Sequence, residues 1–489
     1  MRMGRQFFRM LGAGMLAAGL LAGYAPGAAG AEPGAAAGSG GWGKAVTLGG
    51  GAGAPSLMSC SSPGSCTAAG QLGGYVYTVR QVRGAWGKPA VIRGTARTSR
   101  PSSSPGGLAC FRAGGCVLAG TYRDSFGHSQ AFIVTRSRGT WGKLTVVPGL
   151  ARLDRGNSAG ISYLSCPSAG NCTAAGSYTD AKRGGHEFTV SQARGRWGHA
   201  VPVPGVTGLP GQAPGTIAGF QAISCPAAGT CAAGGSYQVG AGPNPGGQAF
   251  VVDEVRGTWG TPQPVPGLAA LNTGLYAVLD VISCPSPGNC AAGGGYTEAN
   301  GVTVPFVVNE THGTWGTATE VNSSISDWPG DGAWVTAMSC PSAGNCLAGG
   351  LYQVFVDGHA SKVFVVSEVN GTWGQAIPVP GTSRLNQGFD AWVTQISCSS
   401  AGNCGVAGWY SATDDRDLAL FFRQPFVATE VHGTWRWAIE VPGIKTPPPS
   451  IGSFAATTTI ACPAPGRCSA GGYYQDAKGR YHTFVVSQP

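Results

Sequence analysis

The sequence predicts an all-β protein, an eight-bladed β-propeller of four-stranded blades. Two regularities carry this prediction. First, all 16 cysteines fall in eight Cys-x5-Cys units that recur roughly every 50 to 64 residues, a period that marks a repeat protein. Second, a Trp, followed by Gly in seven of eight cases, punctuates the repeats: Trp42, Trp86, Trp141, Trp197, Trp259, Trp315, Trp373 and Trp435. Four-stranded units repeated about eight times match a propeller, which closes radially and leaves only short edges.

Each repeat is expected to contain four strands, called a to d. In the fifth repeat, strand a ends at Cys284, strand b starts at Cys290, strand c is the Phe306-Val-Val run and strand d begins at Trp315-Gly. Clusters of Pro, Gly and Asn separate these short runs of β-branched and aromatic residues, which favours strands joined by tight turns. No segment has a sustained helical period.

Two spacings recur with the cysteines. Seven repeats place a Tyr six positions after the second Cys, whereas the first repeat has Leu72 there: Tyr122, Tyr178, Tyr237, Tyr296, Tyr352, Tyr410 and Tyr474. Seven repeats place an aromatic residue nine positions before the Trp: Tyr77, Phe132, Phe188, Phe250, Phe306, Phe364 and Phe426. The Trp itself is expected to pack between neighbouring sheets, filling space that Gly leaves. Stacking of all eight indoles on sugars is the alternative.

The paired cysteines are predicted to form one disulfide in each a–b hairpin: Cys60–Cys66, Cys110–Cys116, Cys166–Cys172, Cys225–Cys231, Cys284–Cys290, Cys340–Cys346, Cys398–Cys404 and Cys462–Cys468. Zinc ligation is the alternative. Structural zinc sites usually take four ligands, however, and the seven histidines follow no repeat-wide spacing with the cysteines. A loop this short stabilises the fold by only about 2 kcal/mol.

The two ends of the sequence are complementary. The last repeat stops at residues 484–489, after strand c and before a Trp-Gly strand, and an unpaired Trp-Gly strand lies at residues 41–48. The N-terminal strand is therefore expected to complete the last blade and close the ring, so that residues 41–489 form a single domain. Seven blades plus an extra hairpin is the main rival arrangement.

The phrase Ser-Cys-Pro-Ser-Ala-Gly-Asn-Cys, together with Gly-Thr-Trp-Gly, resembles uncharacterised secreted repeat proteins of high-GC actinobacteria, over essentially the whole mature chain. The Glu-x-x-Gly-Thr-Trp stretches at Glu254, Glu310, Glu368 and Glu430 also resemble, loosely, the Asp-box turn of sialidase-like propellers. They have Glu at another spacing, and the Asp-box is a folding element, so this resemblance implies no sialidase activity.

Residues 1–31 have the order of a secretory signal peptide: Arg2, Arg5 and Arg9, then an apolar run, then small residues ending in an Ala-Gly-Ala site. Residues 32–40 read as a short Gly/Ala linker. The apolar run is too short for a membrane span. Cysteine pairs also fit an oxidising, extracellular destination. We therefore expect a secreted monomer.

Charged residues are 11% of the chain, and its formal net charge is +9. The basic residues are scattered, with no Lys/Arg run, so the sequence does not predict nucleic-acid binding. The a–b and c–d turns barely vary in length, whereas the b–c and d–a connections do. In a propeller the two kinds of connection lie on opposite faces. Binding is expected on the variable face, because a ring of equal turns offers no unique site.

Three groups on that face are candidate ligand-binding residues. Trp334 and Trp392 each lie six residues before a strand-a Cys and are expected near the channel mouth. Acidic residues two positions after the repeated Tyr are expected to form a rim, or to be ordinary turn residues: Asp124, Asp180, Glu298 and Asp476. The third group lies at the longest b–c insertion and consists of Trp409 and the acidic residues that follow it, Asp414, Asp415 and Asp417. Calcium is possible there through oxygen ligands, and no other metal or cofactor is expected.

The sequence favours a non-catalytic binding or scaffolding protein whose partner is an extracellular glycan or a surface protein. The alternative is a propeller enzyme, a glycoside hydrolase or a lyase acting on extracellular polysaccharide. A glycosidase needs two carboxylates across one bond, and the sequence alone does not single out such a pair. No nucleophile elbow is present either. Catalytic residues stay unassigned.

Overall fold

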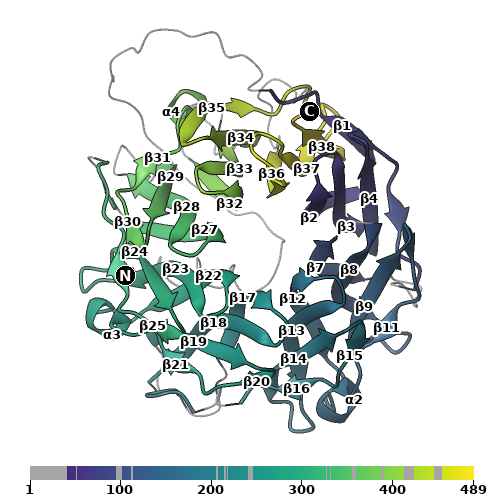
Figure 1. The fold of residues 1–489 in the computed structure, drawn as a ribbon, viewed down its shortest axis with the longest axis vertical. Helices are drawn as coiled ribbons and strands as arrows, with labels where there is room; N and C mark the ends of the chain where they lie inside the picture. The colour runs from purple at the N-terminus through teal and green to yellow at the C-terminus, as the bar shows by residue number, and fades with distance from the viewer. Residues whose placement is uncertain are drawn as a thin grey trace.

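The computed structural model describes residues 41–489 apart from residues 51, 95–101, 112–113, 205–207, 214–215, 217, 241–245, 326–327, 331, 355–359, 387–389, 412–422 and 445–453. The predicted signal peptide, residues 1–31, and the linker, residues 32–40, lie outside the described residues. The chain folds as an all-β protein of antiparallel sheets arranged radially around a common centre, a β-propeller (Figure 1).

The strands follow the predicted order a to d. Strands a are innermost (Figure 1): β2 (Ala52–Ser62), β7 (Ser103–Cys110), β12 (Ala159–Ser168), β17 (Gly219–Ala227), β22 (Ala277–Ser286), β27 (Gly332–Ser342), β32 (Ala391–Ser400) and β36 (Ala455–Ala461). Strands b follow: β3 (Ser65–Leu72), β8 (Cys116–Arg123), β13 (Asn171–Thr179), β18 (Thr230–Val239), β23 (Asn289–Thr297), β28 (Asn345–Val354), β33 (Asn403–Ser411) and β37 (Ser469–Gln475). Strands c are β4 (Tyr75–Val82), β9 (Ser129–Ser137), β14 (Gly185–Ala193), β19 (Gly246–Val255), β24 (Thr303–Thr311), β29 (Ala360–Val369), β34 (Arg423–Val431) and β38 (Tyr481–Ser487).

Strand d is divided into two short pieces in six repeats. The pieces are β5 (Ala85–Trp86) and β6 (Ala90–Val91), β10 (Thr140–Trp141) and β11 (Thr145–Val146), β15 (Arg196–Trp197) and β16 (Val201–Pro202), β20 (Thr258–Trp259) and β21 (Gln263–Pro264), β25 (Thr314–Trp315) and β26 (Thr319–Glu320), and β30 (Thr372–Trp373) and β31 (Ile377–Pro378). In the seventh repeat strand d is the continuous β35 (Thr434–Glu440). The remaining outer strand is β1 (Val46–Gly50), which pairs antiparallel with β38.

Two further features modify the predicted pattern. A parallel pair, Thr303 with Gly332, links the sheets of the fifth and sixth repeats into one ten-stranded sheet. Within the described residues, three four-residue helices that the sequence did not predict lie in d–a connections: α2 (Leu150–Leu153), α3 (Leu268–Leu271) and α4 (Thr382–Leu385). Each begins after a Gly with positive φ and is too short to leave a helical period in the sequence.

The a–b and c–d turns lie side by side and are joined by a backbone hydrogen bond in six repeats. In the fifth repeat the Gly313 N–H of the c–d turn donates to the Gly288 carbonyl oxygen of the a–b turn at 2.9 Å. The c–d turn has positive φ at both central residues, 51° at His312 and 80° at Gly313, as a two-residue hairpin of this twist requires. We call the face with these turns the repetitive face, and the face with the b–c and d–a connections the variable face.

The core lies between the sheets. The aromatic residue of every strand c is fully buried: Tyr77, Phe132, Phe188, Phe250, Phe306, Phe364, Phe426 and Phe484. The repeated Trp packs between neighbouring sheets, as predicted. Trp315 Nε1, for example, donates to Asp253 Oδ2 of the preceding repeat at 2.9 Å, and Trp373 Nε1 donates to Asn309 Oδ1 at 3.0 Å. Burial of such large rings is a main source of stability.

All eight predicted disulfides are present. The N–H of the first Cys in a hairpin also donates to a Ser side chain of the preceding repeat, as Cys284 does to Ser224 Oγ at 2.9 Å. The same bond joins five further pairs: Cys110 to Ser59, Cys225 to Ser165, Cys340 to Ser283, Cys398 to Ser339 and Cys462 to Ser397. The Ser-Cys phrase of the sequence therefore ties six of the eight hairpins to a neighbouring repeat.

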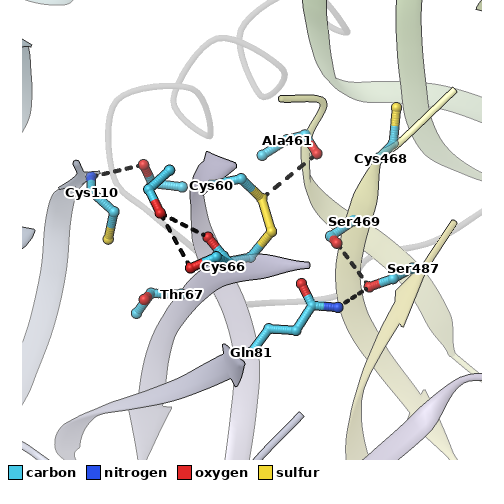
Figure 2. Close-up of a disulfide and its surroundings, with 12 residues drawn as sticks. Cys60, Cys66, Thr67, Gln81, Cys110, Ala461, Cys468, Ser469 and Ser487 are labelled. Atoms are coloured by element: carbon cyan, nitrogen blue, oxygen red, sulfur yellow. Dashed lines mark hydrogen bonds between the residues drawn. A yellow bond between two sulfur atoms is a disulfide. The ribbon is translucent and has the colours of Figure 1, made fainter. Parts of the chain in front are cut away.

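The first and last repeats are in direct contact (Figure 2). Ser487 Oγ accepts from Gln81 Nε2 at 2.9 Å and from Trp86 Nε1 at 3.1 Å, and it shares a hydrogen bond with Ser469 Oγ at 2.7 Å. Cys60 Sγ, which carries no hydrogen because it belongs to a disulfide, lies 3.8 Å from the Ala461 carbonyl oxygen. Residues from the two ends of the described chain thus interdigitate.

Candidate functional site

The acidic residues predicted to form a rim hold their own b–c turns. Asp180 Oδ1 accepts from the N–H groups of Lys182 and Gly184, both at 2.8 Å, and Asp180 Oδ2 lies 3.0 Å from His186 Nε2. The bond from His186 is the main cause that lowers the pKa of Asp180 below its usual value. His186 in turn stacks on Tyr178, with ring centres 5.2 Å apart.

The other members of the predicted rim make similar local bonds. Asp476 accepts from the Lys478 and Arg480 N–H groups and from His482 Nε2, and Asp124 accepts from the Phe126 and His128 N–H groups. Glu298 Oε2 accepts from Asn300 Nδ2 at 3.2 Å. Each carboxylate belongs to a separate turn. The predicted group at Asp414, Asp415 and Asp417 lies outside the described residues.

Trp334 and Trp392 occupy equivalent positions in neighbouring repeats but have different surroundings. Trp334, on β27, lies against the fifth repeat, since a β-carbon placed on Gly295 would be 2.7 Å from Trp334 Cδ1. Trp392, on β32, is paired across the strands with Trp409 on β33, so both side chains are on the same face of the sheet. The structure therefore brings together two of the three predicted tryptophans.

A cation extends this pair across the same sheet. The Arg423 guanidinium carbon, on β34, lies 4.0 Å from the centre of the Trp409 ring and 5.8 Å from that of Phe454 in the eighth repeat. A guanidinium over an indole face is held by the negative charge of the ring system. Trp392, Trp409 and Arg423 are each half-buried, and they lie at the ends of β32, β33 and β34 next to the connections of the variable face.

Two polar groups complete this site. Burial raises the pKa of Asp390, and a bond to Ser361 and the positive charge of Arg423 oppose the rise. Burial likewise raises the pKa of Tyr473, and Arg423 opposes this rise too. Arg423 therefore lies near an acid and a phenol as well as an indole. We call the group Trp392, Trp409, Arg423, Tyr473 and Asp390 the aromatic platform.

A second cluster lies where the third, fourth and fifth repeats meet. Tyr163 Oη donates to the Phe220 carbonyl oxygen at 3.2 Å, and the Phe220 N–H bonds to Glu187. With its amide oriented to satisfy its neighbours, Gln221 donates to the Leu279 carbonyl oxygen at 2.7 Å and to Asp280 Oδ1 at 3.1 Å. We call Tyr163, Glu187, Gln221, Tyr276 and Asp280 the central polar cluster.

The acids of the central polar cluster titrate in an unusual range. Burial raises the pKa of Glu187 to about 8 and that of Asp280 to about 7. Burial also raises the pKa of Tyr163 and Tyr276 to about 12, with a smaller contribution from the nearby carboxylates. Groups perturbed in this way concentrate at functional sites, although structural networks produce them too.

The central polar cluster and Arg423 were not predicted from the sequence. Asp280 occupies a bulge four residues before the first Cys, where the other repeats have uncharged residues: Ser56, Gly106, Ser162, Gln221, Thr336, Thr394 and Thr458. Glu187 precedes the strand-c aromatic, where the other repeats also have uncharged residues. An alignment of the repeats with one another would have shown both departures.

Three further observations delimit the site. A shallow depression lined by Val365, Trp373 and Ile377 lies on the outer strands of the sixth repeat and holds no titratable group, so we do not assign function to it. Among the described residues, no three His, Cys, Asp or Glu side chains are grouped so as to hold a metal ion. Within the same residues, no helix is long and apolar enough to cross a bilayer.

No family model and no curated protein matches the chain. Among solved structures, it is similar to YCF48 from Cyanidioschyzon merolae, with 11% identity over 78% of this chain and 95% of that chain and a TM-score of 0.42. It is also similar to a polysaccharide lyase, PL25 ulvanlyase bound to -[GlcA(1-4)Rha3S]-, with 11% identity over 80% of this chain and 93% of that chain and a TM-score of 0.42. A third similar structure is the β-propeller domain of the trilobed protease from Pyrococcus furiosus, with 7% identity over 78% of this chain and 95% of that chain and a TM-score of 0.40. Likenesses this distant carry no argument about function.

Proposed function

We propose that residues 41–489 form a single, secreted, eight-bladed propeller whose ring is closed by β1. The pairing of β1 with β38 supports this proposal, as do the bonds of Ser487 to the first repeat. Trp42 Nε1 lies 3.4 Å from Thr429 Oγ1 of the seventh repeat, the contact that Trp315 makes with Asp253 elsewhere in the ring. Eight disulfides favour an oxidising compartment.

We further propose that the protein binds a glycan on its variable face, at the aromatic platform, without transforming it. The pairing of Trp392 with Trp409 beneath Arg423 carries the proposal. Half-buried indole faces suit the C–H faces of sugar rings. A guanidinium and a carboxyl group beside them suit sugar hydroxyls, since one donates and the other accepts. Rigid strands position all of these groups, which limits the entropy lost on binding.

The test is titration of the protein with glycans selected on an array. Trp392→Ala and Trp409→Ala are each expected to weaken binding by more than about 1 kcal/mol, roughly fivefold, because buried aromatic anchors dominate binding energy. Trp334→Ala serves as the matched control, since that indole packs on the fifth repeat. The proposal fails if both variants keep full affinity. It also fails if either lowers the Tm as much as Trp315→Ala, because the indole is then only packing.

The central polar cluster favours a second candidate, a polysaccharide-active enzyme. A general acid or base works best with a pKa near the operating pH, and Glu187 and Asp280 titrate in that range. Release of new reducing ends or unsaturated products from the bound glycan would support this candidate, provided that Glu187→Gln or Asp280→Asn abolishes the release while binding persists. Binding without turnover supports the first candidate.

A further inference from the structure

The repetitive face is uneven in charge, although its turns are equal in shape. In the first three repeats, the c–d segments 80–88, 135–143 and 191–199 hold eight basic residues and no acidic one: Arg80, Arg83, Lys88, Arg136, Arg138, Lys143, Arg194 and Arg196. In the next three repeats, the equivalent segments 253–261, 309–317 and 367–375 hold one basic residue, Arg256, and four acidic residues, of which Glu254, Glu310 and Glu368 are buried. We call the eight basic residues the basic sector.

Folding brings these residues together. Strands β4, β9 and β14, which lead into the three turns, belong to sheets that follow one another around the ring (Figure 1). Arg83, Arg138 and Arg194 occupy the same place in each turn, with φ near 50°, and all three are exposed. Residues some 55 positions apart in the sequence therefore lie on three neighbouring hairpin tips.

Two arginines of the basic sector face each other without a counter-charge. The Arg80 guanidinium reaches the turn of the next repeat, where a β-carbon placed on Gly139 would be 3.2 Å from Nη1. Arg136 is buried, and its Nε donates to the Gly114 carbonyl oxygen at 3.0 Å. Burial lowers the pKa of Arg136 to about 10, and the charge of Arg80 adds to this effect. Among the described residues, neither arginine forms an ion pair.

The other repeats show that this arrangement is not required by the fold. At the position of Arg136 the other seven repeats have Gln or Glu, so a guanidinium is not needed to form the contact between neighbouring sheets. A buried guanidinium beside a second one destabilises the protein unless an anion compensates both. Repeats one and two thus depart from the pattern by placing two arginines, Arg80 and Arg136, at one junction, where a bound anion would offset their repulsion.

We propose that the basic sector binds an extended anionic polysaccharide of the cell exterior through its carboxylate or sulfate groups. Nucleic acid is disfavoured, since the Trp86 and Trp141 indoles lie between sheets, bonded to Ser487 and Thr78, and the exposed hairpin tips carry no aromatic side chain for base stacking. A bilayer is disfavoured too, because among the described residues of these tips Val82 is the one large apolar side chain that is well exposed. This surface is separate from the aromatic platform, on the opposite face.

The test compares R83N/R138N/R194N with the wild-type protein. Asn occupies the same turn position in the sixth repeat, at Asn370 with φ of 50°, so the substitutions preserve the turn. Arg256→Asn, at the same position of the fourth repeat beside Asp253 and Glu254, is the matched control. Fluorescently labelled polygalacturonate is the probe and neutral dextran the reference, with the Tm of each variant showing that it folds.

At about 0.1 M salt we expect the triple variant to lose at least tenfold in affinity for polygalacturonate, with a shallower salt dependence, and Arg256→Asn to bind like wild type. Arg136→Gln is expected to weaken binding and to raise the Tm. The proposal is overturned if wild type binds polygalacturonate no better than dextran, or if Arg256→Asn loses as much as the triple variant. It is also overturned if double-stranded DNA or phosphatidylserine vesicles bind more tightly than polygalacturonate.

Discussion

At the scale of single residues, one position of the repeat holds a buried polar side chain that contacts the preceding repeat. The residue four positions after the strand-c aromatic is polar and buried in every repeat: Gln81, Arg136, Gln192, Glu254, Glu310, Glu368, Glu430 and Gln488. Its neighbour is the side chain three positions after the aromatic of the preceding repeat. In one junction, Asn309 Nδ2 donates to Glu368 Oε1 at 2.6 Å. In the junction before it, Glu310 faces Asp253, so that two acids meet.

The first prediction concerns this acid pair. Burial, reinforced by Asp253, raises the pKa of Glu310 to about 7. Because the folded pKa lies above the unfolded one, the folded state holds the extra proton, and stability is lost as pH rises from about 4.5 through 7. Glu310→Gln should therefore flatten part of the fall in Tm between pH 5 and pH 8.

Asp253→Asn is the matched variant, since it reproduces the Asn309–Glu368 junction. It should raise the Tm at pH 8 because an amide can donate to Glu310, as Asn309 does to Glu368. Thermal melts from pH 5 to pH 8 measure both effects. An unchanged pH dependence in both variants would show that the two carboxyl groups do not interact.

At the scale of elements, the strand-a bulge connects neighbouring repeats. Thr394 Oγ1 donates to the Thr457 carbonyl oxygen of the next repeat at 2.8 Å, and Thr458 Oγ1 donates to that of Pro55 at 2.5 Å. Gly106 occupies the same position in the second repeat, where the Ile161 carbonyl oxygen lies too close for any side chain. The fifth repeat alone puts an acid, Asp280, at this bulge.

The second prediction follows from the bulge. Asp280→Thr should allow the new hydroxyl to donate to the next inner strand, as Thr336 does to the Val393 carbonyl oxygen at 3.0 Å. The variant also removes an acid whose pKa burial raises to about 7. Its Tm gain should be larger at pH 8 than at pH 5, since the wild-type charge forms only as pH rises. A loss of Tm at both values would mean that Gln221 needs the Asp280 carboxylate.

At the scale of the whole molecule, most contacts between the first and last repeats are those found between other neighbouring repeats. The Ser-to-Cys bond cannot form there, because Ala461 stands where six other repeats have Ser. Thr458 and Ser487 nevertheless make the contacts with the first repeat that equivalent residues make at other junctions. The stability of such an assembly is close to a sum over repeats and their interfaces, so each junction matters similarly.

The third prediction tests whether β1 belongs to the ring. Trp42 and Trp315 are buried to the same degree, 4% and 6% exposed, although Trp42 lies far from its neighbours in sequence. Trp42→Ala should therefore destabilise the protein by about 3 to 5 kcal/mol, as Trp315→Ala should, because each leaves a cavity between sheets. Urea unfolding provides the comparison, with the exposed Trp437→Ala as control. Full stability of Trp42→Ala would refute closure by β1.

The sequence by itself determined the repeat, the strand order, the eight disulfides and the packing of the Trp between sheets. It could do so because these features depend on residues a fixed distance apart, such as Cys284 and Cys290. It did not predict helices α2, α3 and α4, since a single turn produces no period. The candidate binding residues could not be ranked from the sequence. Trp334 and Trp392 occupy the same position in their repeats, yet of these two only Trp392 is paired with a second Trp.

Only the tertiary structure decided which distant residues become neighbours. Arg423 of the seventh repeat lies near the ring of Phe454 in the eighth. Glu187 of the third repeat is linked to Asp280 of the fifth through Phe220 and Gln221 of the repeat between them. The scattered arginines of the first three repeats gather on one sector, because radial stacking superimposes equivalent positions. In a linear sequence only runs of adjacent charges stand out, whereas in the fold charges from equivalent positions of successive repeats lie close together. That physical difference is why the repetitive face looked uniform in the sequence, whereas in the fold exposed arginines gather on three neighbouring turns.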